Sequence, residues 1–425
     1  MHSTTRTRRI LTLATGASVA LLLLVIPHPV HLGAAAAAAG GGGGGVRTTE
    51  RSYLSCSAPG GRALGDDRLP CLKVTGSYYD VGRQVGEAFK DRIIQAYHKS
   101  ESSSELHEFA KSSTGQAHLN RWKDAVERYP NVVAEMKGIA DGSGIDYEEV
   151  FLYNCAFEIG IILRKLDSLT SCSDLLVQLP NMVLDGHNED GAGCAMNTSY
   201  LINAQITGND GTVEEDFAAF AYAGILPGNA FSFNQHGLSF AANAVFEKHL
   251  RENGAALPRS VIGRLLISVK TVDELLDKLQ GTEGQSESPI WQSVSSFSLN
   301  IGDRVNAKVM NIELSTRGIS KTTTDNGFLH HFNMFIHTPA PQYMDVSSMR
   351  RTAALYSLDG PTDVNSTLRI LGDTADKEYP IYRRGHPPDE VYTIATAVYD
   401  LLRGVVDIYT TQPLPGATPA YTFSF

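Results

Sequence analysis

The chain has 425 residues, of which 42% are hydrophobic and 19% are charged, and this composition is ordinary for a soluble globular protein. The formal net charge is −10 and the body of the chain has no long run of Lys or Arg, which argues against nucleic-acid binding because that function requires a basic face. Beyond an N-terminal glycine run the sequence contains no glycine-rich phosphate-binding loop, so we expect no nucleotide cofactor.

The first 45 residues have a character of their own. Arg6, Arg8 and Arg9 precede an apolar stretch of 17 residues from Ile10 to Ile26, and Ala and Gly runs fill residues 34–45. A basic start followed by an apolar segment and small residues is typical of a secretory signal peptide. The apolar stretch also approaches the minimum for a membrane span, so a signal anchor is the alternative. We predict a secreted or lumenal protein, membrane-anchored if the segment is retained, with the Ala/Gly tract as a linker.

Two further features suit the secretory route. The N-x-[ST] sequons at Asn197 and Asn365 predict N-glycosylation. The chain has five cysteines, and an odd number leaves at least one thiol unpaired or bonded to another molecule; the five are Cys56, Cys71, Cys155, Cys172 and Cys194. Cys56 and Cys71 are close enough in sequence to close a small loop, and the spacings do not match a zinc site. The odd cysteine is either a buried core residue or a nucleophile.

Ordered structure is predicted to begin near Leu69 and to be helical at first. Apolar residues recur at helical spacing over residues 79–97 and 105–140, with a break at Pro130, and Asp146 fits the N-cap of a helix that runs to residue 162. After Cys172 the pattern changes to short strands at residues 175–179, 182–184, 217–223, 230–233 and 238–242, with a hairpin turn at Asn234–Gly237.

The rest of the chain repeats this alternation. Helices are predicted at residues 257–269 and 271–279, strands at 295–301, 305–313 and 327–335, a helix at 349–358, and a closing hairpin at 391–400 and 405–410. Runs of helices that alternate with runs of strands predict an α+β domain with helices packed on the faces of sheets.

The segment Leu169-Thr170-Ser171-Cys172-Ser173-Asp174 lies where helices give way to strands. A cysteine that leads a strand and is flanked by small residues suits backbone cleavage on its own N-side, by an N-to-S acyl shift followed by hydrolysis. Cleavage gives Cys172 a free α-amino group, whose ordinary pKa of about 8 lets it act as the base for the thiol. The thiol needs such a base because its ordinary pKa is about 8.5. The alternative is that Cys172 is a core residue.

Six segments carry a further pattern when they are taken in order. They are a G-x-x-x-x-x-G-x-x-x-G helix at Gly76–Gly86, a helical segment from Glu135 to Asn154, Cys172-Ser173 with Leu184–Asp190 ending in N-x-D, an N-x-x-G-L strand within Asn234–Asn243, an S-x-N…E strand pair at Ser298–Glu313, and a closing strand at Thr393–Asp400. Together they resemble the acyl-CoA:6-aminopenicillanate acyltransferase family of N-terminal-nucleophile hydrolases, over roughly Lys73 to Tyr409.

The resemblance implies a four-layer αββα sandwich and self-cleavage between Ser171 and Cys172. Residues 46–171 would then form an N-terminal (alpha) subunit and residues 172–425 a catalytic (beta) subunit, both within one domain and associated after cleavage. The family commonly has Gly before the nucleophile, and this chain has Ser171. Because Ser tolerates strained backbone less well than Gly, the difference bears on the efficiency of cleavage and not on the identity of the nucleophile.

The resemblance also implies roles for the site residues. Cys172 attacks the substrate carbonyl to form an acyl-enzyme, and its freed amine carries the proton. Asn300 is the first candidate for stabilising the oxyanion and Asn243 the second. Asp190 would hold the new ammonium group or orient the nucleophile. Either Arg350 or Arg351 would complete the electrostatics, and the match leaves open which of the two.

Several of these residues have a simpler interpretation. Asn188 and Asp190 could satisfy the backbone of a turn, and Arg350 and Arg351 could form a solvated helix face. Asn300 could pair with a buried backbone group. A shared metal site at the histidines is not expected, because adjacent histidines in a strand point to opposite faces. We therefore interpret His187, His330 and His331 as structural or substrate-facing.

The sequence favours an amidohydrolase for small N-acyl amines or N-acyl amino acids, which needs neither metal nor cofactor. The resemblance is to the branch that acts on beta-alanyl amines such as beta-alanyl-dopamine or carcinine, so these are the first candidate substrates. An acyltransferase of the same fold differs only in the nucleophile that resolves the acyl-enzyme. A papain-like protease is disfavoured because Cys172 lacks the C-G-S-C-W signature, and a non-catalytic secreted binding module stays open.

Overall fold

The computed structural model describes residues 69–99, 103–165, 171–252, 254–280 and 291–425. The predicted signal segment, residues 1–45, and the suggested disulfide partner Cys56 lie outside these residues. None of the helices in the described part of the chain combines the length and the apolar character that crossing a bilayer requires.

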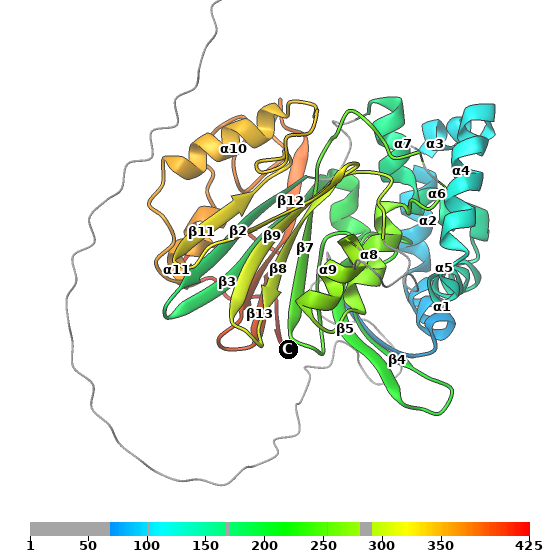
Figure 1. The fold of residues 1–425 in the computed structure, drawn as a ribbon, viewed down its shortest axis with the longest axis horizontal. Coiled ribbons are helices and arrows are strands. Elements are labelled where there is room, and N and C mark those ends of the chain that lie inside the picture. The colour runs from blue at the N-terminus through cyan, green and yellow to red at the C-terminus, as the bar shows by residue number, and fades with distance from the viewer. Residues whose placement is uncertain (1–68, 100–102, 166–170, 253, 281–290) are drawn as a thin grey trace, which may run out of the picture. The chain divides into compact units, whose positions relative to one another are not determined.

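The described chain begins with one strand and a series of helices (Figure 1). They are β1 (Cys71–Gly76), α1 (Tyr78–Ala88), α2 (Lys90–Lys99), α3 (Ser103–Lys111), α4 (Ser113–Val126), α5 (Pro130–Ser143), α6 (Tyr147–Asn154) and α7 (Ala156–Leu163). Ser77 and Asp80 form a capping box that begins α1, and Pro130 is the first residue of α5. The predicted helix over residues 79–97 is interrupted at Phe89, which ends α1.

Strands dominate the remainder. Those of the first half are β2 (Ser171–Leu179), β3 (Met182–Ala192), β4 (Tyr200–Thr207), β5 (Val213–Ala221), β6 (Phe231–Asn234) and β7 (Leu238–Ala244). The second half contains β8 (Phe297–Asp303), β9 (Lys308–Ser315), β10 (Gly318–Thr323), β11 (Gly327–His331), β12 (Val391–Asp400), β13 (Val405–Tyr409) and β14 (Tyr421–Ser424). The helical segments between them are the 3-10 helix η2 (Gly193–Asn197) and the α-helices α8 (Arg259–Ile267), α9 (Val272–Gln280), α10 (Val346–Tyr356) and α11 (Val364–Leu371).

The strands form two sheets that pack face to face. One has eight strands in the order β1-β4-β5-β6-β7-β8-β9-β10, and the other has six in the order β11-β2-β3-β12-β13-β14. A core that includes Leu176, Phe220 and Ala397 fills the space between them. Helices α10 and α11 cover the outer face of the six-stranded sheet, and α1 and α8 lie against the eight-stranded sheet (Figure 1). The expected four-layer αββα sandwich is confirmed.

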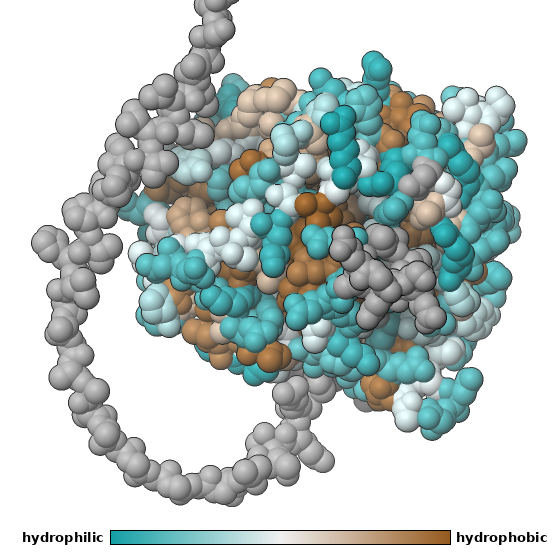
Figure 2. Space-filling model, in the orientation of Figure 1, coloured by the Kyte–Doolittle hydropathy of each residue, from teal (hydrophilic) through white to brown (hydrophobic). Residues whose placement is uncertain are grey.

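The face of the molecule in Figure 2 is largely hydrophilic, with apolar residues gathered in smaller patches. The largest apolar cluster lies inside, between the eight-stranded sheet and its helices, and includes Trp122, Met136 and Phe297. This distribution is what a layered domain with separate apolar cores between its layers produces.

The structure differs from the expected elements at several places. The strand expected at residues 182–184 is longer in the structure, where β3 continues to Ala192, so Asn188 and Asp190 lie in a strand and not in a turn. Their polar side chains lie inside the protein with partners on neighbouring strands and helices, which the local pattern does not show. The strands β1, β4, β10 and β14 and the helix α11 are further elements that the pattern did not indicate.

Candidate active site

Cys172 is the second residue of β2, which belongs to the six-stranded sheet. Its side chain is fully buried and faces the eight-stranded sheet, where Sγ lies 3.5 Å from the carbonyl oxygen of Ala242 on β7. Sγ also lies 3.6 Å from Oε2 of Glu189, the residue directly opposite Cys172 on β3. Burial raises the pKa of the thiol well above its ordinary value, and the charges of Glu189 and Asp174 raise it further. The uncleaved chain therefore holds a protonated thiol beside a carboxylate.

A chain of buried polar groups extends from Cys172 between the sheets. Nε2 of His187 lies 2.9 Å from Glu189 Oε2, and its Nδ1 lies 2.9 Å from Asp174 Oδ1. Burial alone would lower the pKa of His187, but the two carboxylates outweigh it and raise that pKa to about 10. The imidazole is therefore charged at neutral pH and donates from both nitrogens. Tyr222 donates its hydroxyl to Glu189 Oε1, so both carboxylate oxygens are occupied.

The two predicted oxyanion donors belong to the same polar chain. Asn243 on β7 donates Nδ2 to Asp174, and Asn300 on β8 donates Nδ2 to Oδ1 of Asn243 at 2.5 Å. Asn300 in turn accepts from Asn311 at 2.8 Å. The structure thus brings Asn243 and Asn300 into the polar layer of the nucleophile, with their amides bonded to other side chains of that layer.

The peptide bond before Cys172 is held from the opposite face of β2, because successive side chains of a strand alternate. Asn333 Oδ1 accepts from the Cys172 amide at 3.2 Å and from the Ser171 hydroxyl at 2.7 Å. Arg351 donates to the carbonyl oxygen of Cys172, to Ser171 Oγ at 3.1 Å and to Asn333 Oδ1 at 2.8 Å. Its guanidinium is fully buried, and burial lowers its pKa to about 10.

Asp190 lies opposite Ser171 in the strand register and is fully buried. Its Oδ1 accepts from the Thr393 hydroxyl at 2.6 Å, and its Oδ2 has no hydrogen-bond partner and lies 3.9 Å from Arg351. Burial raises the pKa of Asp190 to about 7, against the opposing effect of Arg383 and Arg351. A buried carboxylate oxygen without a donor, next to the cleavage position, could accept a hydrogen bond from a new ammonium group.

The two adjacent arginines are separated by the geometry of α10. Arg351 points into the protein, whereas Arg350 is partly exposed and pairs with Asp376 at 2.8 Å and with Glu378. Consecutive helical residues point about 100° apart, so only one of the two can face the buried strand. The structure therefore places Arg350 outside the site, contrary to its inclusion among the catalytic candidates.

Other predicted residues lie away from the nucleophile. Asn188 donates to carbonyl oxygens of Leu371 and Ile381, as a structural interpretation requires. His331 is buried 3.0 Å from Glu313, and the rings of His330 and Tyr356 meet edge to face. The sequon residues Asn197 and Asn365 are both exposed.

The cysteines divide into bonded and free groups. Cys71 is disulfide-bonded, whereas Cys155, Cys172 and Cys194 carry free thiols. Cys155 and Cys172 are buried and Cys194 is exposed. Burial raises the pKa of the Cys155 thiol well above its ordinary value, and the charge of Glu158 adds to this.

Four residues around Cys172 escaped sequence reasoning. They are Glu189, Tyr222, Arg259 and Asn333, and all but Glu189 are remote from Cys172 in sequence. Glu189 lies within a segment that carries the family pattern, and correct pairing of β2 with β3 would have placed it opposite the nucleophile. The other three carry no local signal, since they come from a loop after β5, the start of α8 and a loop after β11.

Sγ of Cys172, Nε2 of His187 and a carboxylate oxygen of Glu189 lie within 4.8 Å of one another and have ligand types that suit a metal ion. Both nitrogens of His187 already lie at hydrogen-bond distance from carboxylates, and the raised pKa favours its protonated form. Metal binding would require a neutral imidazole, so the arrangement suits proton handling better than coordination.

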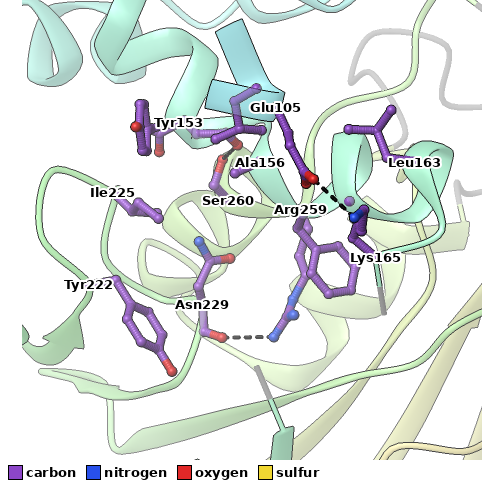
Figure 3. A pocket seen from close by; sticks show the side chains of 14 residues that line it. Glu105, Tyr153, Ala156, Leu163, Lys165, Tyr222, Ile225, Asn229, Arg259 and Ser260 are labelled. Carbon is purple, nitrogen blue, oxygen red and sulfur yellow. Dashed lines mark hydrogen bonds and ion pairs between the residues drawn. The ribbon is translucent and has the colours of Figure 1, made fainter. Parts of the chain in front are cut away.

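Figure 3 shows a cavity of about 200 Å³ whose lining includes Tyr222 and Arg259. Its walls are mainly apolar and aromatic, and they include Tyr153 and Phe157. Two lining residues connect it with the nucleophile: Tyr222 contacts Glu189, and Arg259 donates at 3.1 Å to the same Ala242 carbonyl that Cys172 contacts. Glu105 and Lys165 form an ion pair, 2.9 Å long, on another part of the wall (Figure 3). The cavity therefore lies next to residues that contact Glu189 and the Ala242 carbonyl, while Cys172 itself is buried behind them.

Comparison with known proteins bears on the class of this site. The family model of the acyl-coenzyme A:6-aminopenicillanic acid acyl-transferases matches residues 177–415, more than half of the chain. The chain belongs to this family. It is 27% identical over 368 residues to the beta-alanyl-dopamine/carcinine hydrolase of Drosophila melanogaster, an alignment that covers 81% of this chain and 93% of that protein. The structure of penicillin V acylase from Agrobacterium tumefaciens aligns with 58% of this chain and 84% of that chain, at 12% identity and a TM-score of 0.34.

Membership of the family makes this protein an enzyme that acts on C–N bonds, of the amide hydrolase or acyltransferase class. The family model begins five residues after Cys172 (177 − 172 = 5), so the match itself does not include the nucleophile. The assignment of Cys172 accordingly depends on the geometry described above.

Proposed function

We propose that this protein is a self-processing cysteine amidohydrolase in which Cys172 is the nucleophile, and that it cleaves small N-acyl amines or N-acyl amino acids. The observation that carries the proposal is the environment of one peptide bond. The thiol of Cys172 lies beside a carboxylate, while Arg351 and Asn333 hydrogen-bond to the backbone of Cys172 and to the hydroxyl of Ser171. A buried thiol, a nearby base and an immobilised peptide are the components that an intramolecular acyl shift requires.

Self-cleavage would proceed in two steps. Glu189 accepts the thiol proton as Sγ attacks the carbonyl carbon of Ser171, the C–N bond breaks, and the departing Cys172 nitrogen takes up a proton. The product is a thioester between Ser171 and Sγ. Water then attacks the thioester, which releases the Ser171 carboxylate and restores the thiol. Each step conserves atoms and charge, and neither needs a metal ion or a cofactor.

The new α-amino group would have two buried acceptors within the site. Its nitrogen already lies 3.2 Å from Asn333 Oδ1, and Asp190, opposite Ser171, has an unpartnered oxygen. The amine can then accept the thiol proton during substrate attack and return it to the leaving amine. For the oxyanion, Asn243 and Asn300 are the candidate donors, and either must exchange its present hydrogen bond for one to the substrate.

The two products of cleavage, residues 46–171 and 172–425, are proposed to stay together. Strand β1 of the first pairs in parallel with β4 of the second. A buried ion pair joins Glu135 on α5 to Arg264 on α8 at 2.6 Å. Separation of the two fragments would expose these groups and a large part of the main core to water, which is unfavourable. Cleavage of one peptide bond removes none of these contacts, so we expect the fragments to stay associated.

Beta-alanyl amines are the first candidate substrates, because the relative from Drosophila melanogaster is named for beta-alanyl-dopamine and carcinine. The aromatic walls of the cavity suit the flat ring that both compounds carry. In a transferase, an acceptor amine would replace water as the group that resolves the acyl-enzyme, so product analysis with and without added amine separates the two activities.

The test is denaturing mass spectrometry of the wild type, Cys172→Ala and Cys194→Ala. Cys194 is a free but exposed thiol, so its variant controls for the loss of a cysteine as such. We expect two fragments divided before Cys172 in the wild type and in Cys194→Ala, and one intact chain in Cys172→Ala. The purified cleaved enzyme should then release amine from beta-alanyl-tyramine. An uncleaved wild-type chain would contradict the self-processing mechanism.

We further propose a secretory route with glycans at Asn197 and Asn365, supported by the exposure of both side chains and by the disulfide at Cys71. Enzymatic deglycosylation of protein from a eukaryotic host should lower its mass, and the shift should disappear in the double variant Asn197→Gln/Asn365→Gln. An unchanged mass would count against the glycans.

A further inference from the structure

Arg259 is the first residue of α8 and lines the cavity beside the nucleophile (Figure 3). Its side chain is only 4% exposed. Nη2 donates to two backbone carbonyls, those of Asn229 at 2.8 Å and Ala242 at 3.1 Å, and Nε has no hydrogen-bond partner. The guanidinium therefore has a buried N–H group that no protein acceptor satisfies.

Among the described residues, the charge of Glu158 acts on this guanidinium from a distance, but no carboxylate forms a direct ion pair with it. The buried Arg264, Arg351 and Arg383 each form ion pairs with carboxylates, but in the described part of the chain Arg259 forms none. Glu158 has its Oε1 on the backbone amide of Arg259 at 2.8 Å and on the Ser295 hydroxyl, not on the guanidinium. A buried charge without a partner is unfavourable, and an anionic ligand would remove that cost.

A second unpartnered group lies on the same cavity wall. Asn229 lines the cavity, and its Oδ1 is buried without a donor. Asn229 and Arg259 are held together by a close contact between chain segments: a Cβ on Gly228 would lie 2.2 Å from the carbonyl oxygen of Gly263 on α8. These two lining residues therefore hold one unsatisfied donor and one unsatisfied acceptor, both buried, which a small shift of either side chain would bring to a ligand with a carboxylate and an N–H group.

The remaining walls indicate the body of that ligand. Phe157 stacks on the guanidinium, with 4.8 Å between the Arg259 Cζ and the ring centroid, and Tyr153 and Tyr222 also line the cavity. Such surfaces accept an aromatic side chain. Since Arg259 and Cys172 share the Ala242 carbonyl as a partner, a carboxylate on Arg259 would bring a nearby amide carbon towards the thiol.

We propose that Arg259 binds a substrate carboxylate, so that the preferred leaving group is an aromatic amino acid and not the corresponding decarboxylated amine. The inference rests on the proposed function, because it concerns the substrate of the same nucleophile. The two proposed substrate classes, N-acyl amines and N-acyl amino acids, differ by this carboxylate. Arg259 would therefore determine which of the two classes the enzyme prefers. A planar guanidinium suits this part because it can hold a carboxylate by two parallel hydrogen bonds.

The test uses substrate pairs that differ only in the carboxylate: beta-alanyl-tyrosine against beta-alanyl-tyramine, and acetyl-tyrosine against acetyl-tyramine. We expect the wild type to show the higher kcat/KM for the tyrosine compound of a reactive pair. Arg259→Gln should lower kcat/KM for the tyrosine compound by about 10- to 100-fold more than for the tyramine compound, as expected for a lost charged hydrogen bond to the carboxylate. Arg259→Lys should retain part of the preference, and Arg350→Gln should behave as the wild type.

Equal losses on both members of a pair, or a wild-type preference for the tyramine compound, would overturn the proposal. Binding supplies a readout that does not depend on catalysis. Free tyrosine should raise the melting temperature of Cys172→Ala more than tyramine does, and the Arg259→Gln/Cys172→Ala double variant should lose the difference. If no pair is hydrolysed but this binding difference appears, the proposed reaction has failed and the carboxylate site stands. If the enzyme hydrolyses a pair but shows no binding difference, the reaction stands and the carboxylate site has failed.

Discussion

Exchange of Arg351 for Gln tests the claim that the protein holds its own cleavage site in place. In the structure the guanidinium donates to the Cys172 carbonyl, Ser171 Oγ, Ser173 Oγ and Asn333 Oδ1. Gln carries one amide group and a shorter chain, so it cannot supply these donors together. The Ser171–Cys172 peptide would keep its strand register but lose the hydrogen bonds that Arg351 donates from α10.

Two magnitudes follow from the contacts. Removal of one partner from a buried, charged network costs roughly 3–5 kcal/mol of folding stability. A displacement of the peptide by about 1 Å lowers the rate of an intramolecular reaction by on the order of 100-fold. Arg350→Gln is the matched control, because it removes the same chemical group one residue earlier from a partly exposed ion pair, and exposed pairs contribute little.

The assay follows cleavage after cell-free synthesis by denaturing gel, alongside urea unfolding of purified protein. We expect Arg351→Gln to be cleaved slowly and to unfold at lower urea, Arg351→Lys to recover part of the rate, and Arg350→Gln to match the wild type. Slow cleavage of Arg350→Gln with normal cleavage of Arg351→Gln would refute the assignment. If Arg351→Gln were less stable but were cleaved at the wild-type rate, the hydrogen bonds of Arg351 would contribute to folding stability and not to self-cleavage.

Three further predictions concern single residues. Glu189→Gln should slow self-cleavage by about 10²- to 10⁴-fold because it removes the base, and it should also lower stability in urea because it takes one carboxylate from the buried His187; a wild-type rate on the gel would exclude the role as base. Gly228→Ala should lower the free energy of unfolding, measured in urea, by at least about 1–3 kcal/mol, because φ is +100° and the new Cβ would meet the Gly263 carbonyl. The control is Gly254→Ala, which should leave the stability unchanged because its new Cβ would have nothing within 4 Å. Burial, aided by the charge of Asp174, raises the pKa of Asp185 to about 7. The stability that the protonated carboxyl provides is therefore complete below about pH 4 and is lost as pH rises through 7. Asp185→Asn should reduce the fall of the unfolding free energy with pH by up to about 1.4 kcal/mol per pH unit, and an unchanged pH dependence would contradict the raised pKa.

Much of the fold follows from local chemistry. The Asn234–Gly237 turn joins β6 and β7 as expected, with Gly237 at a φ of +81° that suits glycine. Pro130 opens a helix, and Asp146 precedes another. These features depend on neighbours within a few residues, so the sequence states them directly.

Strand β3 shows where local reasoning ends. Its second half is a run of polar residues that resembles a turn, yet it forms a buried strand because each side chain has a remote partner. His187 lies between two carboxylates, and Asn188 bonds to a carbonyl 183 residues away. A polar run is read as exposed unless the partners that satisfy it are known.

The sequence by itself determined the α+β class, the change from helices to strands at Cys172, and that cysteine as the candidate nucleophile. Only the tertiary structure decided what surrounds it. Asn333 and Arg351 reach the Ser171–Cys172 bond from 161 and 179 residues along the chain, and Arg350 points elsewhere. The physical reason is that helix rotation and strand register are set by the packing of whole layers, and a change of one residue in either would turn every side chain to another face.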